Sequence, residues 1–122
     1  MEKNMARELA VELTVEITKC CDSIRGRTAY VNQLLRSASS VGANISEAKY
    51  AQSRADPIHK LEIALKECHE TEYWLEVLYR LDTIPPEQYQ KLVSNTESIM
   101  KILIASVRTI KNEKEERMKS EE

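Results

Sequence analysis

Apolar residues recur every three or four positions in four separate stretches of this 122-residue chain. The stretches cover residues 9–24, 31–48, 58–79 and 89–110. Such spacing places the apolar side chains on one face of an α-helix. The chain also holds only two glycines and three prolines, the residues that interrupt helices most strongly. The sequence therefore predicts an all-α protein built from four amphipathic helices.

Capping residues mark where these helices begin and end. Gly26 is predicted to end the first helix, because glycine adopts the left-handed conformation of a helix end without strain. Thr28 is the predicted N-cap of the second helix, which runs to about Gln52. Asp56 followed by Pro57 signals the start of the third, since aspartate caps free amides and proline fits the first helical position.

The segment DTIPPEQ, residues 82–88, separates the third helix from the fourth, which Pro86 is predicted to open. The alternating charges of residues 111–122 indicate that this helix gives way to a solvated, mobile tail. Three short connections between helices of similar length imply antiparallel neighbours. We therefore expect one domain, residues 1–122, folded as an up-down-up-down four-helix bundle.

Composition narrows the class of protein further. Eighteen Lys and Arg against twenty Asp and Glu give a net charge of -2, unlike the basic body of a typical nucleic-acid-binding protein. The N-terminal stretch has no long apolar run, so neither a signal peptide nor a membrane span is expected and a cytoplasmic location is predicted. Cys20, Cys21 and Cys68 are odd in number and lack zinc-type spacing, which predicts buried free thiols.

A carboxylate-type metal-binding enzyme is the alternative function, because four-helix bundles can hold di-iron carboxylate sites. Those sites use Glu-x-x-His pairs from facing helices, and the sequence contains none. His59-x-x-Glu62 and His69-x-x-Glu72 have the reverse order and share one predicted helix. The chain also lacks a glycine-rich phosphate loop and a Ser or Cys nucleophile with a convincing base. We therefore expect no catalytic residues, no metal ligands, no cofactor and no small-molecule substrate.

The segment RSASSVGANISEA, residues 36–48, is rich in small residues although it lies inside the second predicted helix. At about 100° per residue, Arg36, Ser40, Ala43 and Glu47 share the face opposite the apolar stripe. Two interpretations stay open: another helix approaches this small face closely, or the face is solvated.

The third predicted helix is apolar on two sides. Trp74, Val77 and Leu81 cannot share the face of Leu75 and Tyr79. One small bundle cannot bury both faces, so we expect a second subunit to cover one of them. The predicted oligomer interface consists of Arg36, Ser40, Ala43, Glu47, Trp74, Val77 and Leu81.

Glu72 stands in the apolar stripe of the third predicted helix, where leucine is expected. A buried carboxylate needs a partner, and an arginine can bind it with two hydrogen bonds. The sequence therefore predicts a structural ion pair between Glu72 and Arg36, which reaches it from a neighbouring helix or from a neighbouring subunit.

The segment LLRSASSVGANISEAKYAQSRADPIHKLEIALKECHETEYWLEVL closely resembles the central signature of the four-helix bundle protein family. That family includes proteins encoded by intervening sequences within bacterial 23S ribosomal RNA genes. The residues that fit the signature are Arg36, Asn44, Glu47, Lys60, Glu67, Glu70, Tyr73, Trp74 and Leu75. The resemblance implies a ring-like homopentamer and a distant similarity to accessory proteins of diversity-generating retroelements. No enzymatic activity is established for the family.

The leading hypothesis is a non-enzymatic, homo-oligomeric scaffold or adaptor whose partner is RNA or an RNA-processing or retroelement protein. Candidate phosphate contacts are Arg25 and Arg27 in the first connection and Lys49 and Arg54 in the second. Antiparallel topology places these two connections at opposite ends of one subunit. Ordinary solvated surface charge is the alternative interpretation.

Overall fold

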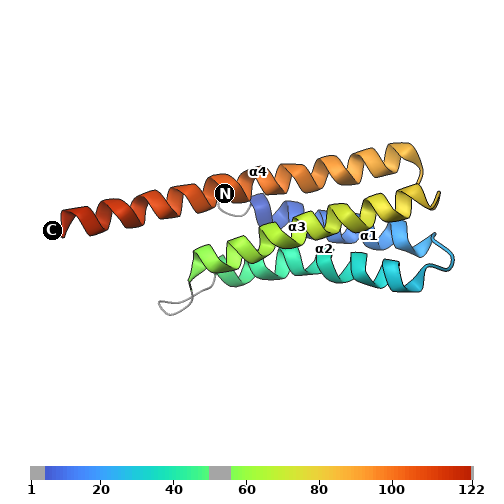
Figure 1. Ribbon diagram of the computed structural model, residues 1–122, viewed down its shortest axis with the longest axis horizontal. Coiled ribbons are helices and arrows are strands. Elements are labelled where there is room, and N and C mark those ends of the chain that lie inside the picture. The colour runs from blue at the N-terminus through green and yellow to red at the C-terminus, as the bar shows by residue number, and fades with distance from the viewer. Residues whose placement is uncertain (1–4, 50–55, 122) are drawn as a thin grey trace.

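The computed structural model describes residues 5–49 and 56–121, which form four helices joined by short connections (Figure 1). They are α1 (Met5–Asp22), α2 (Thr28–Lys49), α3 (Pro57–Arg80) and α4 (Pro86–Ser120). Each helix contacts the next one along the chain, and α1 also contacts α4, which closes the bundle. The predicted all-α four-helix bundle is confirmed. The longest helix, α4, extends beyond one end of the other three.

The two proline-marked helix starts are confirmed. The Ile58 N–H donates to Asp56 Oδ1 at 3.0 Å, and Pro57 is the first residue of α3. Pro86 is the first residue of α4, where the Tyr89 N–H donates to the Pro85 carbonyl at 2.9 Å. Because proline lacks an N–H, it occupies a position where the helix has no intrahelical donor to lose.

The first connection begins earlier than predicted. Helix α1 ends at Asp22, not at Gly26, and the Ile24 N–H bonds back to the Cys21 carbonyl at 3.0 Å in a tightened last turn. Gly26 does have a positive φ of 73°, but it lies within the connection. Arg27, not Thr28, precedes α2, and its carbonyl accepts the first helical hydrogen bond, from the Val31 N–H at 2.9 Å. The predicted end of the second helix near Gln52 lies outside the described residues.

The prediction that the last helix ends before the charged tail is wrong. Helix α4 continues to Ser120, although every described residue from position 111 onward is exposed. Lysine, glutamate and arginine have high helix propensity, and pairs such as Glu113 and Arg117 place opposite charges four residues apart. Local propensity thus explains a helical end whose described residues are all exposed.

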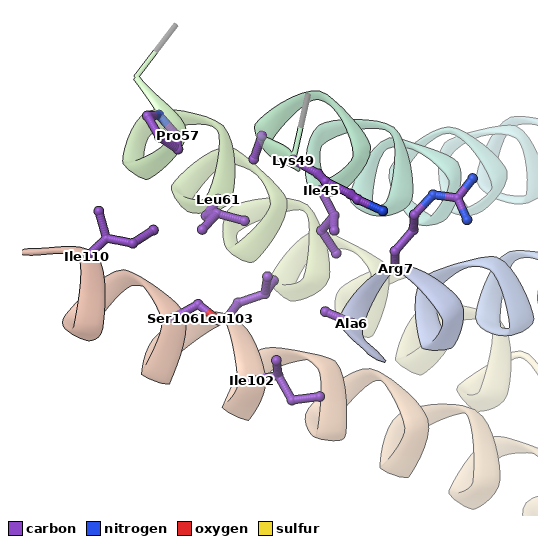
Figure 2. A pocket seen from close by; sticks show the side chains of 11 residues that line it. Ala6, Arg7, Ile45, Lys49, Pro57, Leu61, Ile102, Leu103, Ser106 and Ile110 are labelled. Atoms are coloured by element: carbon purple, nitrogen blue, oxygen red, sulfur yellow. The ribbon is translucent and has the colours of Figure 1, made fainter. Parts of the chain in front are cut away.

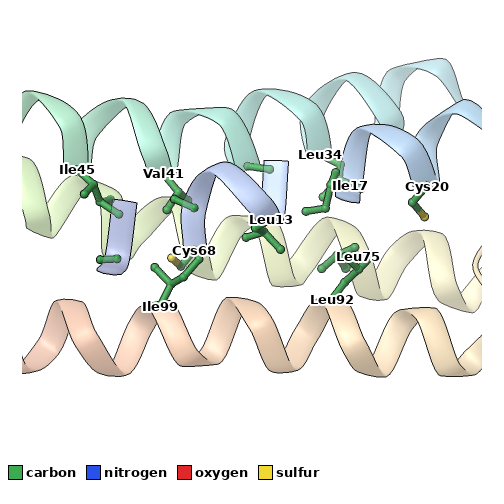
Figure 3. Packing of buried hydrophobic residues seen from close by; sticks show 14 of the residues in the cluster. Leu13, Ile17, Cys20, Leu34, Val41, Ile45, Cys68, Leu75, Leu92 and Ile99 are labelled. Atoms are coloured by element: carbon green, nitrogen blue, oxygen red, sulfur yellow. The ribbon is translucent and has the colours of Figure 1, made fainter. Parts of the chain in front are cut away.

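Side chains from all four helices meet in one buried core (Figure 3). Leu13, Leu34, Leu75 and Leu92 each come from a different helix and are fully buried or nearly so. Buried polar groups in this core are bonded: the Thr71 hydroxyl lies 3.0 Å from Ser37 Oγ and 2.8 Å from the Glu67 carbonyl oxygen.

The three cysteines are free and buried, as predicted. Burial raises the pKa of the Cys68 thiol to about 12, so this thiol stays protonated at neutral pH. A protonated buried thiol packs as a small apolar group and is a poor nucleophile.

Part of the small-residue segment of α2 faces α1. A Cβ atom added at Gly42 would lie 3.3 Å from the Cβ of Ala10, tighter than an ordinary contact. Nearby, Thr14 Oγ1 of α1 lies 3.3 Å from the Ala38 carbonyl oxygen of α2. The small residues therefore allow a close approach of two helices within one subunit.

Candidate functional site

A polar network joins α2 to α3 along their outer seam. Arg36 Nη1 lies 3.4 Å from the carboxylate of Glu67, and Arg36 Nη2 contacts the carboxylate of Glu70. The Trp74 indole N–H donates to Glu70 at 3.2 Å, and Ser40 Oγ lies 3.4 Å from Glu67. The hydrogen bond from Arg36 is the main reason that the pKa of the Glu70 carboxyl is lowered. This network ties the two helices together at the protein surface.

The predicted ion pair between Arg36 and Glu72 does not form within one subunit, because Arg36 binds Glu67 and Glu70 instead. The buried stripe of α3 passes through Cys68, Thr71 and Leu75, so Glu72 lies beside it and is half-buried. Glu72 faces the α4 side, in a hollow that Glu97 of α4 also lines. A rotation of about 100° per residue separates Thr71 from Glu72, which explains how one step along the sequence moves the carboxylate off the core.

The surroundings of Glu72 disfavour its charged form. Burial, and then the nearby carboxylate of Glu97, raise the pKa of Glu72, and His69 partly offsets them. Because the folded pKa lies above the unfolded value, ionised Glu72 lowers stability at neutral pH, and this loss disappears as pH falls below the unfolded pKa.

We expect Glu72→Gln to raise the free energy of unfolding at pH 7, by less than about 1 kcal/mol for this partly solvated group. The gain should shrink toward pH 4, where the carboxyl takes up a proton in both states. Urea unfolding at the two pH values measures it. Glu12→Gln, at an exposed position of α1, is the matched control. A Glu72→Gln protein that is less stable than the wild type at pH 7 would contradict this assignment.

The structure divides the predicted interface face of α2. Arg36, Ser40 and Glu47 all engage α3 within the subunit, Glu47 through an ion pair of 2.6 Å with Lys60. Ala43 is exposed on the other flank, where it lines a groove of about 240 Å³ between α1 and α2. That the seven residues form an oligomer interface stays a prediction.

The second apolar face of α3 is partly covered within the subunit. Trp74 stacks on Tyr30 of α2 with ring centroids 5.8 Å apart, and Val77 and Leu81 are half-buried. Tyr73 packs edge-on against Trp74, with a centroid distance of 4.9 Å, yet stays 59% exposed. Tyr73 is therefore the most exposed aromatic residue of this face.

Sequence reasoning missed three exposed apolar residues elsewhere. Val11 and Val15 of α1 are 43% and 45% exposed, and Ile104 of α4 is 43% exposed. The two valines are four residues apart and lie off the apolar stripe of their helix. That spacing on a second face was the available signal.

The candidate phosphate contacts do not form one patch. Arg25 and Arg27 are exposed in the connection between α1 and α2. Lys49 is the last residue of α2, so a helix of 22 residues, about 33 Å long, separates it from Arg27. Arg54 lies outside the described residues.

A cavity of about 320 Å³ opens at the end of the bundle where α1 and α3 begin and α2 ends (Figure 2). All four helices line it. Sequence reasoning missed this cavity, because no single helix shows it.

Within residues 5–49 and 56–121, no three His, Cys, Asp or Glu side chains gather closely enough to hold a metal ion. None of the described helices has the length and apolar character needed to cross a membrane.

The fold and these surfaces place the protein in the class of all-helical bundle proteins. Its described surface carries ion-pair networks between helices and exposed apolar side chains. Residues 2–105 match the family described as 23S rRNA-intervening sequence protein, and the chain belongs to that family. This chain is similar to a protein with unknown function from the S23 ribosomal protein family, from Bacteroides thetaiotaomicron, whose crystal structure is known. The two sequences are 42% identical. The alignment covers 88% of this chain and 99% of that one, with a TM-score of 0.81. Among curated proteins, no match is found.

Proposed function

We propose that this protein is a non-enzymatic scaffold that assembles from several copies of the same chain, as the ring-like homopentamer implied by its family. The observation that carries the proposal is the exposure of large apolar side chains on outer faces of the bundle: Val11, Val15, Tyr73 and Ile104. Val11 and Val15 line the groove between α1 and α2, and Tyr73 packs edge-on against Trp74, so each of these two sites offers neighbouring apolar side chains for an interaction. A second copy would remove this surface from water.

The exposed apolar residues fall on unlike faces. Val11 and Val15 lie on α1 beside the groove that Ala43 lines, whereas Tyr73 lies on α3. Helix α1 contacts α2 and α4, so α3 occupies the opposite corner of the bundle. Contact between two unlike faces repeats from copy to copy and can close into a ring. This geometry supports a ring over a two-fold dimer.

Light scattering tests the assembly. We expect the wild type to have a mass of several times 14.0 kDa, and Val15→Glu and Tyr73→Glu each to fall to the mass of one chain. The carboxylate of the introduced glutamate would lose its hydration if the subunits packed together, and this cost disfavours assembly. Ser98→Glu, at an exposed position of α4, is the control that should keep the wild-type mass.

Mixing the two variants distinguishes the contact geometry. If unlike faces meet, an equimolar mixture of Val15→Glu and Tyr73→Glu contains one intact pair of faces and should form dimers. Circular dichroism confirms that each variant is folded. A wild type that is monomeric at micromolar concentration would contradict the scaffold proposal, and a Tyr73→Glu protein that stays a dimer would contradict contact between unlike faces.

RNA is the partner that we propose for such an assembly, with Arg25 and Arg27 as its contacts. The supporting observation is that both guanidinium groups belong to exposed residues of one short connection, which a ring would repeat once per subunit. A chain of net charge -2 offers no broad basic surface, so binding should be weak, independent of sequence and steeply reduced by salt.

Charge reversal at Arg25 and Arg27 should reduce the salt dependence of RNA binding by about one unit of logarithmic slope for each phosphate that is no longer neutralised. Titration of labelled single-stranded and duplex RNA at several salt concentrations measures this slope. Lys101→Glu makes the same charge change at an exposed position of α4 and is the control. Tight, salt-insensitive binding would contradict the electrostatic contact, and no binding at low salt would indicate a protein partner.

A further inference from the structure

The cavity at the end of the bundle is built from a buried floor and small walls. Leu61 and Leu103 form part of the floor and are 8% and 1% exposed. Ala6, Ala48 and Ser106 line it from α1, α2 and α4, at positions where larger apolar residues would fill the space. The sequence therefore leaves this end of the core hollow.

Among the described residues that line the cavity, the charged ones are both cationic. They are Arg7 of α1 and Lys49 of α2, and they lie on the same side of the cavity (Figure 2). Arg7 Nε donates to Ser46 Oγ at 3.2 Å, and Arg7 Nη1 lies 3.4 Å from Glu8. A guanidinium has five N–H donors, so three of them are not used by described residues. The rim of the cavity can thus donate hydrogen bonds to an anion.

Ser106 adds a polar group inside the cavity. Its side chain is half-buried, and no described residue forms a hydrogen bond with its hydroxyl. This hydroxyl is therefore available to donate a hydrogen bond to an acceptor atom of a ligand, in place of water.

We propose that the cavity binds a small molecule with an apolar chain and an anionic end, such as a medium-chain carboxylate. The apolar chain occupies the space between Leu61, Leu103 and Ala48, and the carboxylate lies at the rim beside Arg7. At roughly 30 Å³ per water-sized group, a volume of about 320 Å³ holds about ten non-hydrogen atoms. Octanoate has this size.

Ligand-observed NMR with the full chain at neutral pH tests the proposal with matched probes. Octanoate should bind about tenfold tighter than octan-1-ol and octylamine, because only the carboxylate matches the cationic rim. Butanoate, which lacks four methylene groups, should bind far more weakly, since each buried methylene contributes about fourfold in affinity. Equal binding of octanoate, octan-1-ol and octylamine would overturn the proposal, as would an absence of octanoate binding.

Two variants separate the cavity from its rim. Ser106→Leu should weaken octanoate binding at least about tenfold by filling the cavity. Ala105→Leu adds the same side chain at an exposed position of α4 and should leave binding unchanged. Arg7→Gln should weaken the binding of octanoate but not that of octan-1-ol. This comparison remains a test of the proposal even if the Ser106→Leu protein does not fold. Unchanged octanoate binding by Arg7→Gln, or by a folded Ser106→Leu protein, would overturn the proposal.

Discussion

Replacing Leu75 with alanine is expected to lower the free energy of unfolding by about 2–5 kcal/mol. Leu75 is fully buried in the C-terminal half of α3, and it lies beside Leu92 of α4 (Figure 3). Removing its branched end takes packed atoms out of a close-packed interior and leaves a cavity that the neighbouring helices fill only in part. The cost is therefore larger than the transfer of three carbon atoms to water.

Urea denaturation of Leu75→Ala and wild type at one protein concentration measures this loss, because the stability of an oligomer depends on concentration. Met118→Ala is the control. It also shortens a helical apolar side chain, but Met118 is 60% exposed near the end of α4. We expect the control to change stability by no more than about 0.5 kcal/mol. A Leu75→Ala loss of the same size as the control would mean that the core is not packed as described.

Gly42→Leu is expected to destabilise the protein by about 1–3 kcal/mol. The first added atom, Cβ, would already lie 3.3 Å from the Cβ of Ala10, and the rest of the leucine side chain would force α1 and α2 apart. Leucine has a better helix propensity than glycine, so the local effect of the change favours stability by somewhat less than about 1 kcal/mol. A net loss therefore reports the tertiary contact and not the helix itself.

Asn32→Leu is the control for this second prediction, because Asn32 is exposed on the same helix. Both variants are compared by urea denaturation and by circular dichroism. If Gly42→Leu is as stable as the wild type, α1 and α2 can separate without cost, and the small residues of this segment need another explanation.

The sequence predicted the elements of the fold well, because those signals are local. The Asp56–Pro57 and Pro86 starts depend on residues adjacent in the chain, and the structure confirms both. Local signals were weaker where several residues compete for one role. A positive φ at Gly26 fits both a glycine that ends α1 and a glycine in the connection a few residues beyond the end of α1. The charged tail could likewise be helical or irregular with the same residues.

The candidate site was predicted far less well, because it depends on how the helices are placed against one another. A stripe with helical periodicity covers a broad arc of the helix. The sequence therefore does not show whether Thr71 or Glu72 faces the core, and the packing of α4 against α3 decides it. Glu67, Glu70 and Glu72 lie within six residues of one another on α3, and the offset between α2 and α3 decides that Arg36 pairs with Glu67 and Glu70.

By itself, the sequence determined that this chain forms four helices and where two of them begin, because hydrogen bonding, capping and side-chain periodicity act over a few residues. Tertiary structure alone decided the ion pairs of Arg36, the partly solvated position of Glu72 and the cavity lined by all four helices. These features depend on the rotation and offset of one helix against another. Such parameters are set by the packing of many side chains together, and no short segment of the chain encodes them.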